Sequence, residues 1–403
     1  MFKTTIKINR KTLFIALLSS FLILPFQFLI LNYFDIIGTT AGNQVQNFSK
    51  ALVGIFYLLA FPYVFKKKKK IFINTYIISF FIFLSHIFIF SQNAKQIINL
   101  IFPFFFMSLP SFIYAYSIEN LNEFKKVMFK LSKYILLIGF VISILNLLKL
   151  LSIGSYSMSL SYYMLLPALM YLNYFFNKKK LSYILFFLIS LMIIISFGAR
   201  GPILCISIYF LYELIRFNKK MDIKSFILYV LIIFSLIIIV FFYEDILIFI
   251  NDFLGNFGIR SRTINLFIRE NIHMSGRDDI FMKGIQTIRD NPLIGVGIAG
   301  DRHLRGNYIH NIFLEILMNY GVIIGLFLII LILSMSIWGI FLNEKNKSDL
   351  IAIWFCMGFV PLLVSSSYLI KIEFWIFLGI LFNLFSRKSK IKLINDGYSS
   401  LSN

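Results

Sequence analysis

The sequence predicts an all-α polytopic membrane protein of about twelve transmembrane helices, with one large extracytoplasmic loop that carries short helices. Composition is the first observation. Hydrophobic residues make up 59% of the 403 residues and charged residues 14%, whereas soluble domains average about 45–50% and about 25%. The second is that the apolar residues form runs of about 20, the length that crosses a bilayer as a helix. A soluble enzyme, a disulfide-rich scaffold and a disordered tail are excluded.

The predicted spans fall into two groups around a polar segment. Their approximate limits are 12–34, 47–65, 71–90, 96–117, 134–151, 157–176, 181–199, 201–217, 225–243, 309–341, 350–370 and 373–386. We therefore divide the chain into a bundle of about nine spans at 1–243, a loop at 244–308, and about three spans with a tail at 309–403. The last span is short and the break at Arg200-Gly201-Pro202 is tight, so the count is open by about one.

Basic residues predict the orientation of the spans, because cytoplasmic turns carry an excess of Lys and Arg. With the N-terminus inside, the basic clusters fall on the inner side at every second turn, at 3–11, 66–70, 125–133, 178–180, 216–224, 345–347 and 387–392. Both termini are therefore predicted to be cytoplasmic. The net charge of +21 comes largely from such anchors, so we expect membrane lipids and no nucleic acid as partners.

Residues 244–308 form the one long polar segment, and the topology places it outside. It contains arginines and lysines offset by acidic residues, which does not contradict the orientation because long loops are translocated largely regardless of charge. The external ionisable groups thus gather in one place. We expect any chemistry in this loop and at the membrane face beneath it.

The loop contains a predicted short helix that begins at Ser275-Gly276-Arg277-Asp278. Ser275 and Asp278 have the spacing of a capping box, and Asn291-Pro292 ends the helix. An apolar stripe at helical spacing follows the cap, at Phe281, Ile285 and Ile288. The helix N-terminus with Arg277 beside it suits a phosphate. The alternative is a capped surface helix with a solvated arginine.

Gly295-Val296-Gly297 comes next and lacks the lysine of a P-loop, so we predict a tight turn that returns the chain to the membrane. The apolar stretch 309–341 follows. As a helix it would extend roughly 50 Å, more than the bilayer core needs, so we expect its start to protrude outside. His310 would lie at the mouth of the bundle, either as a general base or as an interfacial side chain.

Arg200 follows a fully apolar stretch, at the outer end of two predicted spans. A charged residue near a span usually faces the bundle interior or a water-filled cavity and marks function. The alternative is an arginine that snorkels to the interface. No sequence motif for a metal, ATP or NAD site is present in the chain, and we predict no cofactor.

The ordered set of motifs is more specific than any one of them. It consists of Arg200-Gly201, Ser275-Gly276-Arg277, Asn291 to Gly297, His310-Asn311, Phe313-Leu314-Glu315 and Tyr320 to Gly325. This set resembles the bacterial O-antigen ligase and O-antigen polymerase superfamily, over about residues 195–330. Members of that superfamily are inner-membrane glycosyltransferases with one large periplasmic loop.

The resemblance implies roles for individual residues. Arg200, Arg277 and His310 match residues thought to surround the diphosphate of an undecaprenyl-linked glycan donor and the attacking sugar hydroxyl, and they are our catalytic candidates. Substrate binding is predicted for the other motif residues Ser275, Gly276, Asn311 and Glu315. The stretch Phe-Gly-Ala-Arg-Gly-Pro departs from many relatives, which have Ser or Thr just before the arginine.

The leading hypothesis is a polysaccharide polymerase that joins lipid-linked repeat units by metal-independent, inverting transfer. Its rival is an O-antigen ligase that moves the glycan from undecaprenyl diphosphate to a lipid A-core acceptor. A flippase for lipid-linked oligosaccharides is the third hypothesis, but it predicts ionisable residues near mid-membrane and repeat symmetry. The sequence leaves open the sugar, the linkage, the oligomeric state and whether a chain-length regulator is a partner.

Overall fold

The computed structural model describes residues 10–151, 153, 157–217, 248–249, 251–253, 255 and 277–399. These residues form helices, turns and irregular connections, with no strand among them. The predicted all-α class is confirmed to that extent. The chain forms two compact units, Met1–Leu17, Gly54–Lys125 and Ser275–Asn403 in the first, and Leu18–Val53 and Lys126–Met274 in the second. The predicted boundary at 243/244 lies outside the described residues.

Six helical segments of the described part are long and apolar enough to cross a membrane. They are α1 (Arg10–Tyr33), α2 (Thr40–Ile89), the run Ser91–Tyr116 that contains α3 (Ala94–Pro103) and α4 (Leu109–Tyr116), α5 (Leu121–Leu147), α15 (Ile312–Ile340), and the run Lys345–Leu363 that begins with α16 (Lys345–Trp354). The span predicted at 225–243 lies outside the described residues. The total of about twelve therefore stays a prediction.

Most predicted limits agree with the helices to within a few residues. Helices α6 (Met158–Tyr163) and α7 (Leu165–Lys178) cover the span at 157–176, and α8 (Leu181–Ser196) and α9 (Arg200–Phe217) cover the next two. Helix α2 contains both stretches predicted at 47–65 and 71–90, and its backbone leaves helical geometry at Lys68. This break falls inside the lysine run that the sequence places at a turn.

Three predicted limits were wrong. The helix predicted at 373–386 continues to Ser399. Helix α5 begins at Leu121 rather than at 134, because lysines are good helix formers even where they end an apolar run. The predicted span at 350–370 stops being helical at Leu363, and residues 364–371 are turns and irregular chain. This irregular stretch contributes to the polar network described below.

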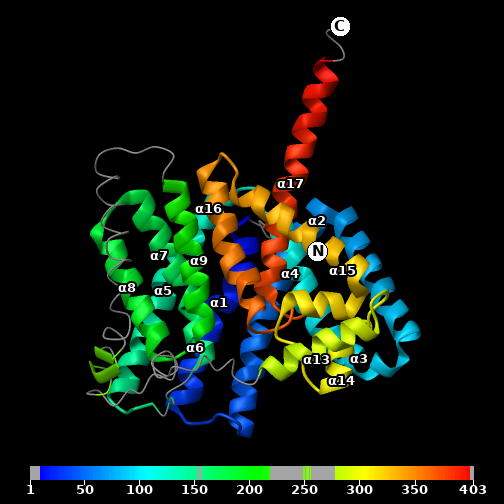
Figure 1. The fold of residues 1–403 in the computed structure, drawn as a ribbon. Coiled ribbons are helices and arrows are strands. Elements are labelled where there is room, and N and C mark those ends of the chain that lie inside the picture. The colour runs from blue at the N-terminus through cyan, green and yellow to red at the C-terminus, as the bar shows by residue number, and fades with distance from the viewer. Residues whose placement is uncertain are drawn as a thin grey trace, which may run out of the picture. The chain divides into compact units, whose positions relative to one another are not determined.

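The first unit packs its C-terminal helix α17 (Ile372–Ser399) along α4 (Figure 1). The approach is close, since a Cβ atom added at Gly379 would lie 2.3 Å from the carbonyl oxygen of Phe112. Large side chains such as Trp354, Phe374 and Phe124 are fully buried in this unit. These buried side chains form part of the core of the first unit.

Helix α13 (Arg277–Asp290) packs on α15 through a glycine. Gly284 is buried, and a Cβ atom there would lie 2.2 Å from Cδ1 of Ile309 and 3.7 Å from Sδ of Met318. The predicted apolar stripe is partly correct, because Phe281 and Ile288 flank Gly284 and are half-buried, whereas Ile285 is exposed. The predicted end of this helix before Asn291-Pro292 is confirmed.

The turn after α13 fills a break in α15. Gly321 has φ 75° and ψ 177°, so α15 is interrupted there. The N–H of Val296 donates to the carbonyl of Met318 at 2.7 Å, and the N–H of Val322 donates to the carbonyl of Pro292 at 2.7 Å. Two backbone groups freed by the interruption are therefore satisfied by the turn. The turn predicted at Gly295-Val296-Gly297 is present, and it also locks α13 and α14 (Gly300–Arg305) to α15.

The break at Gly321 also separates two parts of α15 that differ in side-chain exposure. From Ile312 to Val322 no residue is exposed, whereas exposed apolar side chains begin at Ile323 and recur along the rest of the helix. Residues 323–340 would rise about 27 Å, close to the roughly 30 Å of a hydrocarbon layer. The exposed apolar residues 323–340 are thus long enough to cross a hydrocarbon layer by themselves, and the protrusion expected for the start of α15 stays a prediction.

Candidate functional site

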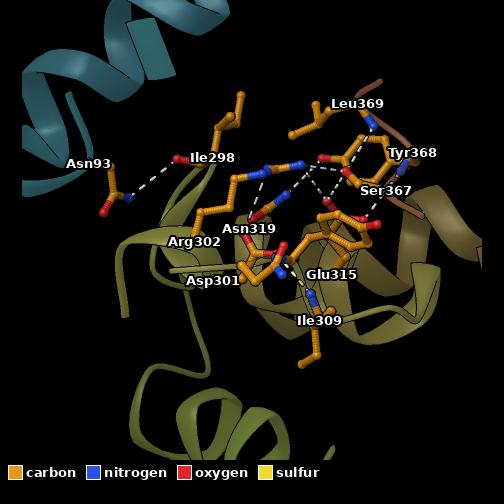
Figure 2. A network of polar contacts seen from close by, with 12 residues as sticks. Asn93, Ile298, Asp301, Arg302, Ile309, Glu315, Asn319, Ser367, Tyr368 and Leu369 are labelled. Carbon is orange, nitrogen blue, oxygen red and sulfur yellow. Dashed lines mark hydrogen bonds and ion pairs between the residues drawn. The ribbon is translucent and has the colours of Figure 1, made fainter. Parts of the chain in front are cut away.

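A buried polar network lies at the N-terminal end of α15 (Figure 2). It joins three stretches that are far apart in the sequence: Asp301 and Arg302 of α14, Glu315 and Asn319 of α15, and Ser367 and Tyr368 of the irregular segment 364–371. All of them belong to the first unit. The network is thus assembled by tertiary packing rather than by local sequence.

Arg302 is the centre of the network. Its Nη2 donates to the hydroxyl of Ser367 at 2.7 Å and lies 3.7 Å from Oε1 of Glu315, while its Nη1 lies 3.8 Å from Oδ1 of Asp301. The Ser367 hydroxyl donates to Glu315 in turn, and the N–H of Tyr368 donates to Oε2 of Glu315 at 3.3 Å. Arg302 and Glu315 together hold the 364–371 segment against α15.

The network places two carboxyl groups beside one guanidinium. The side chains of Asp301 and Glu315 are 0% exposed and that of Arg302 is 13% exposed. Burial raises the pKa of Asp301, and the neighbouring Arg302 guanidinium and backbone N–H groups oppose the rise. Because unpaired buried charges are costly, the ionised state of these carboxyl groups depends on Arg302.

The network continues through hydroxyl groups. Asn319 donates to the hydroxyl of Tyr368 at 2.9 Å, and this hydroxyl donates to that of Tyr320 at 3.3 Å. Burial raises the pKa of Tyr368 well above its ordinary value, so the phenol stays neutral and acts as a donor and acceptor. The chain of contacts ends next to the break at Gly321 and so connects the network to the turn that fills it.

His310 and Asn311 lie where α14 leads into α15. Asn311 caps α15, since its Oδ1 accepts the N–H groups of Phe313 at 3.0 Å and Leu314 at 3.2 Å, while its Nδ2 donates to the carbonyl of Leu363 at 3.2 Å. The ring of His310 packs against that of Tyr308, with centroids 4.3 Å apart. The Arg302 guanidinium lies 5.9 Å from the Tyr308 ring. The histidine is therefore linked to the network through Tyr308.

Three non-glycine residues near this site have left-handed backbone conformations. They are Ala299, His310 and Ser366, with φ of 61°, 60° and 65°. Ala299 lies two residues before Asp301, and His310 and Ser366 directly precede Asn311 and Ser367. Such conformations cost of order 1–3 kcal/mol and gather at functional sites. The strain at His310 marks this residue independently of the sequence motif.

The structure gathers some predicted site residues and separates others. His310, Asn311 and Glu315 lie together at the start of α15, and Arg277 is the first residue of α13 in the same unit. Arg200 is the first residue of α9 in the second unit, where a Cβ atom at Gly201 would lie 2.1 Å from the Tyr162 hydroxyl. Ser275 and Gly276 lie outside the described residues. No metal-holding group of three or more His, Cys, Asp or Glu occurs in the part described.

The residues that pair with Glu315 do not stand out in the sequence. Arg302 and Asp301 are two of many charged residues in the polar loop, and Ser367 and Tyr368 fall inside the span predicted at 350–370. A signal was present: Ser365 to Tyr368 form a polar island between two apolar runs. Such an island inside a predicted span indicates buried polar function or an irregular backbone at the membrane edge.

Comparison with known proteins gives one match. Residues 184–330 match a protein-family model described as O-antigen ligase. No curated protein and no solved structure matches the chain. The matched range includes Arg200, α13, the turn at the α15 break, α14 and the first part of α15, and it ends before the segment that contains Ser367.

Proposed function

The chain is a member of the O-antigen ligase/polymerase superfamily, which its match over residues 184–330 supports, and from this premise we propose that it is a membrane polysaccharide polymerase. Its donor would be a glycan linked to undecaprenyl diphosphate, and its acceptor the sugar end of a second lipid-linked repeat unit. The product would be an O-antigen or capsule-type polysaccharide, formed at the periplasmic face of a bacterial inner membrane.

The depth of the site carries this proposal. His310 precedes α15, and the Arg302 network contacts the first turns of this helix, ahead of the stretch 323–340 in which exposed apolar side chains recur. Glu315 lies six residues before Gly321, about 9 Å along the helix. We propose that, with residues 323–340 across the hydrocarbon layer, this is the level of the lipid headgroups, where a lipid-linked diphosphate presents its phosphates and its sugar. A transferase for a water-soluble sugar nucleotide would not need a site at this depth.

We propose the following chemistry. Neutral His310 accepts the proton of the acceptor hydroxyl, whose oxygen bonds to the anomeric carbon while the bond from that carbon to the diphosphate oxygen breaks. The diphosphate leaves with the electron pair, and the configuration at the anomeric carbon is inverted. Arg277 and Arg200 stabilise the charge on the leaving group, which in this proposal requires no metal.

The remaining predicted residues support the site in different ways. We propose that Ser275 and Gly276 bind a phosphate at the start of α13. Asn311 and Glu315 hold the start of α15 in shape, because their polar atoms contact Leu363, Ser367 and Tyr368. We propose the same supporting role for Arg302, because it contacts Ser367 and the carboxyl groups of Asp301 and Glu315.

A ligase is the second candidate, because the family that residues 184–330 match is described as O-antigen ligase and the match does not separate the two activities. It would use the same donor and transfer the finished glycan to a lipid A-core acceptor. The donor chemistry is common to both activities. The acceptor therefore has to be determined by experiment.

Deletion of the gene in its host tests the proposal. A polymerase predicts surface glycans that carry a single repeat unit on the core, with single units on the lipid carrier. A ligase predicts a bare core with polymer retained on the carrier. An unchanged ladder of surface glycans would contradict both candidates in that strain.

A further inference from the structure

The turn between α13 and α14 carries two large aliphatic side chains that are exposed. Leu293 is 67% exposed and Ile294 is 63% exposed, although both lie in a segment flanked by polar helices. Exposed aliphatic side chains are common singly. Two neighbouring exposed aliphatic side chains that adjoin further exposed apolar side chains form a larger apolar patch, and such a patch indicates a contact surface.

The apolar patch at Leu293 and Ile294 continues onto α15. The carbonyl of Pro292 accepts the N–H of Val322, and the carbonyl oxygen of Leu293 would lie 2.1 Å from a Cβ atom at Gly321. The turn therefore lies directly beside the first residues of the helix whose apolar side chains are exposed. These are Ile323, Ile324 and Phe327, which are 68%, 52% and 65% exposed.

The position along α15 fixes the depth of this surface. Residues 323–340 would rise about 27 Å, which nearly fills a hydrocarbon layer of roughly 30 Å. With residues 323–340 across that layer, Leu293 and Ile294 lie at its edge, on the side where α15 begins. Arg289, at the end of α13, is exposed and precedes the turn, as expected for an arginine at headgroup level.

We propose that Leu293 and Ile294 form a membrane anchor that inserts among the acyl chains at the edge of the hydrocarbon layer nearest the start of α15. The anchor holds α13 and α14 on the membrane surface, and it sets the height of His310 and of the Arg302 network above the acyl chains. Bilayer lipid is the occupant because this surface continues the lipid-facing surface of a membrane span. The proposal does not depend on the chemistry proposed above.

Spin labelling of the full-length protein in lipid vesicles tests the anchor. A nitroxide label is attached after Leu293→Cys, and its collision rates with oxygen and with a water-soluble nickel complex are measured. Two matched positions serve as references: Phe327→Cys for a lipid-facing site, and Asn307→Cys for an exposed polar site. The native Cys205 and Cys356 are buried, and unsubstituted protein gives the labelling background.

The expected result is a ratio of oxygen to nickel collisions at position 293 that matches position 327 and exceeds position 307. A ratio equal to that at position 307 would place the turn in water and overturn the proposal. Low collision rates with both reagents would also overturn it, because a second copy or another protein would then cover the surface. Ile294→Cys, tested in parallel, guards against a local effect of the first substitution.

Discussion

At the scale of single residues, His310 combines three properties that rarely coincide. It has a left-handed backbone conformation, it directly precedes the residue that caps α15, and its ring packs on Tyr308. Strain of this kind persists only where the surroundings determine the conformation. Here the cap at Asn311 and the packing at Tyr308 supply that determination. The arrangement fixes the imidazole relative to the network centred on Arg302.

We predict that His310→Ala lowers the turnover of glycan transfer by about 10²–10⁴-fold, the range for loss of a general base. The amount of protein in the membrane should be unchanged. The measurement is polymer formation from lipid-linked repeat units in reconstituted vesicles. His303→Ala is the matched control, since His303 is an exposed histidine in the same segment, and it should retain activity. Full activity of His310→Ala would remove the histidine from the mechanism.

Arg302 gives a prediction about stability. Arg302→Gln removes the cation beside two buried carboxyl groups, and breaking such a buried arrangement costs about 3–5 kcal/mol. We therefore expect a marked fall in the thermal unfolding temperature in detergent. The double variant Arg302→Gln with Glu315→Gln should be more stable than Arg302→Gln alone. If the loss of stability in the double variant equals the sum of the losses in Arg302→Gln and Glu315→Gln, the two groups do not interact.

The pH dependence of the same variant follows from Asp301. Burial raises its pKa and Arg302 opposes the rise, so removal of Arg302 should raise the pKa further. A carboxyl group with a raised pKa binds its proton more tightly when folded, and the folded state loses stability as pH rises above about 4. Between about pH 4 and pH 7, Arg302→Gln should lose more stability than the unsubstituted protein. Parallel stability curves would contradict this assignment.

These residues also show what sequence alone could give. His310, Asn311 and Glu315 were found because they form a motif within a few positions of one another. Arg302 and Ser367 were not, because their pairing joins positions 65 residues apart, and no local pattern encodes such a contact. The structure places Arg200 in the second unit, so its role next to Arg277 remains a prediction.

At the scale of elements, the turn and the break in α15 form one joint. The sequence predicted the turn from its glycines, but not that the turn would satisfy the backbone of a broken helix. The apolar pattern of 309–341 is continuous across Gly321. Hydropathy therefore does not reveal the break, because residues of the turn, and not a change of side chains in α15, supply the hydrogen bonds that the broken helix lacks. The end of α13 before Asn291-Pro292 and the limits of α8 and α9 around Arg200-Gly201-Pro202 were predictable because residues that break helices lie there.

We predict that Gly321→Ala separates the turn from α15. The backbone conformation at Gly321 is essentially restricted to glycine, and the new Cβ atom would lie 2.1 Å from the carbonyl oxygen of Leu293. Faster hydrogen exchange of residues 291–299 and loss of glycan transfer are expected. Gly38→Ala is the control, because Gly38 also has a left-handed φ but no atom within 4 Å of its added Cβ. It should cost only about 1–2 kcal/mol and leave the turn protected.

At the scale of the whole molecule, we propose that the polar network lies at one membrane surface. The exposed apolar residues of α15, the turn beside Gly321 and the network around Glu315 follow one another towards the start of this helix. The positive-inside pattern adds the direction, because the basic residues Lys345 and Lys347 lie just past the opposite end of α15. The site should therefore face the periplasm.

Two asparagines test this orientation. Asn307 precedes α15 and Asn346 follows it, and both are exposed. In intact spheroplasts a membrane-impermeant maleimide should label Asn307→Cys and not Asn346→Cys, and both should react after lysis. The background should be low because Cys205 and Cys356 are buried. The reverse pattern would place the site in the cytoplasm. A site there could not form polymer in the periplasm, and the loop 244–308 would not have been translocated. This result would overturn the proposed function together with the topology, because both depend on the same direction of α15.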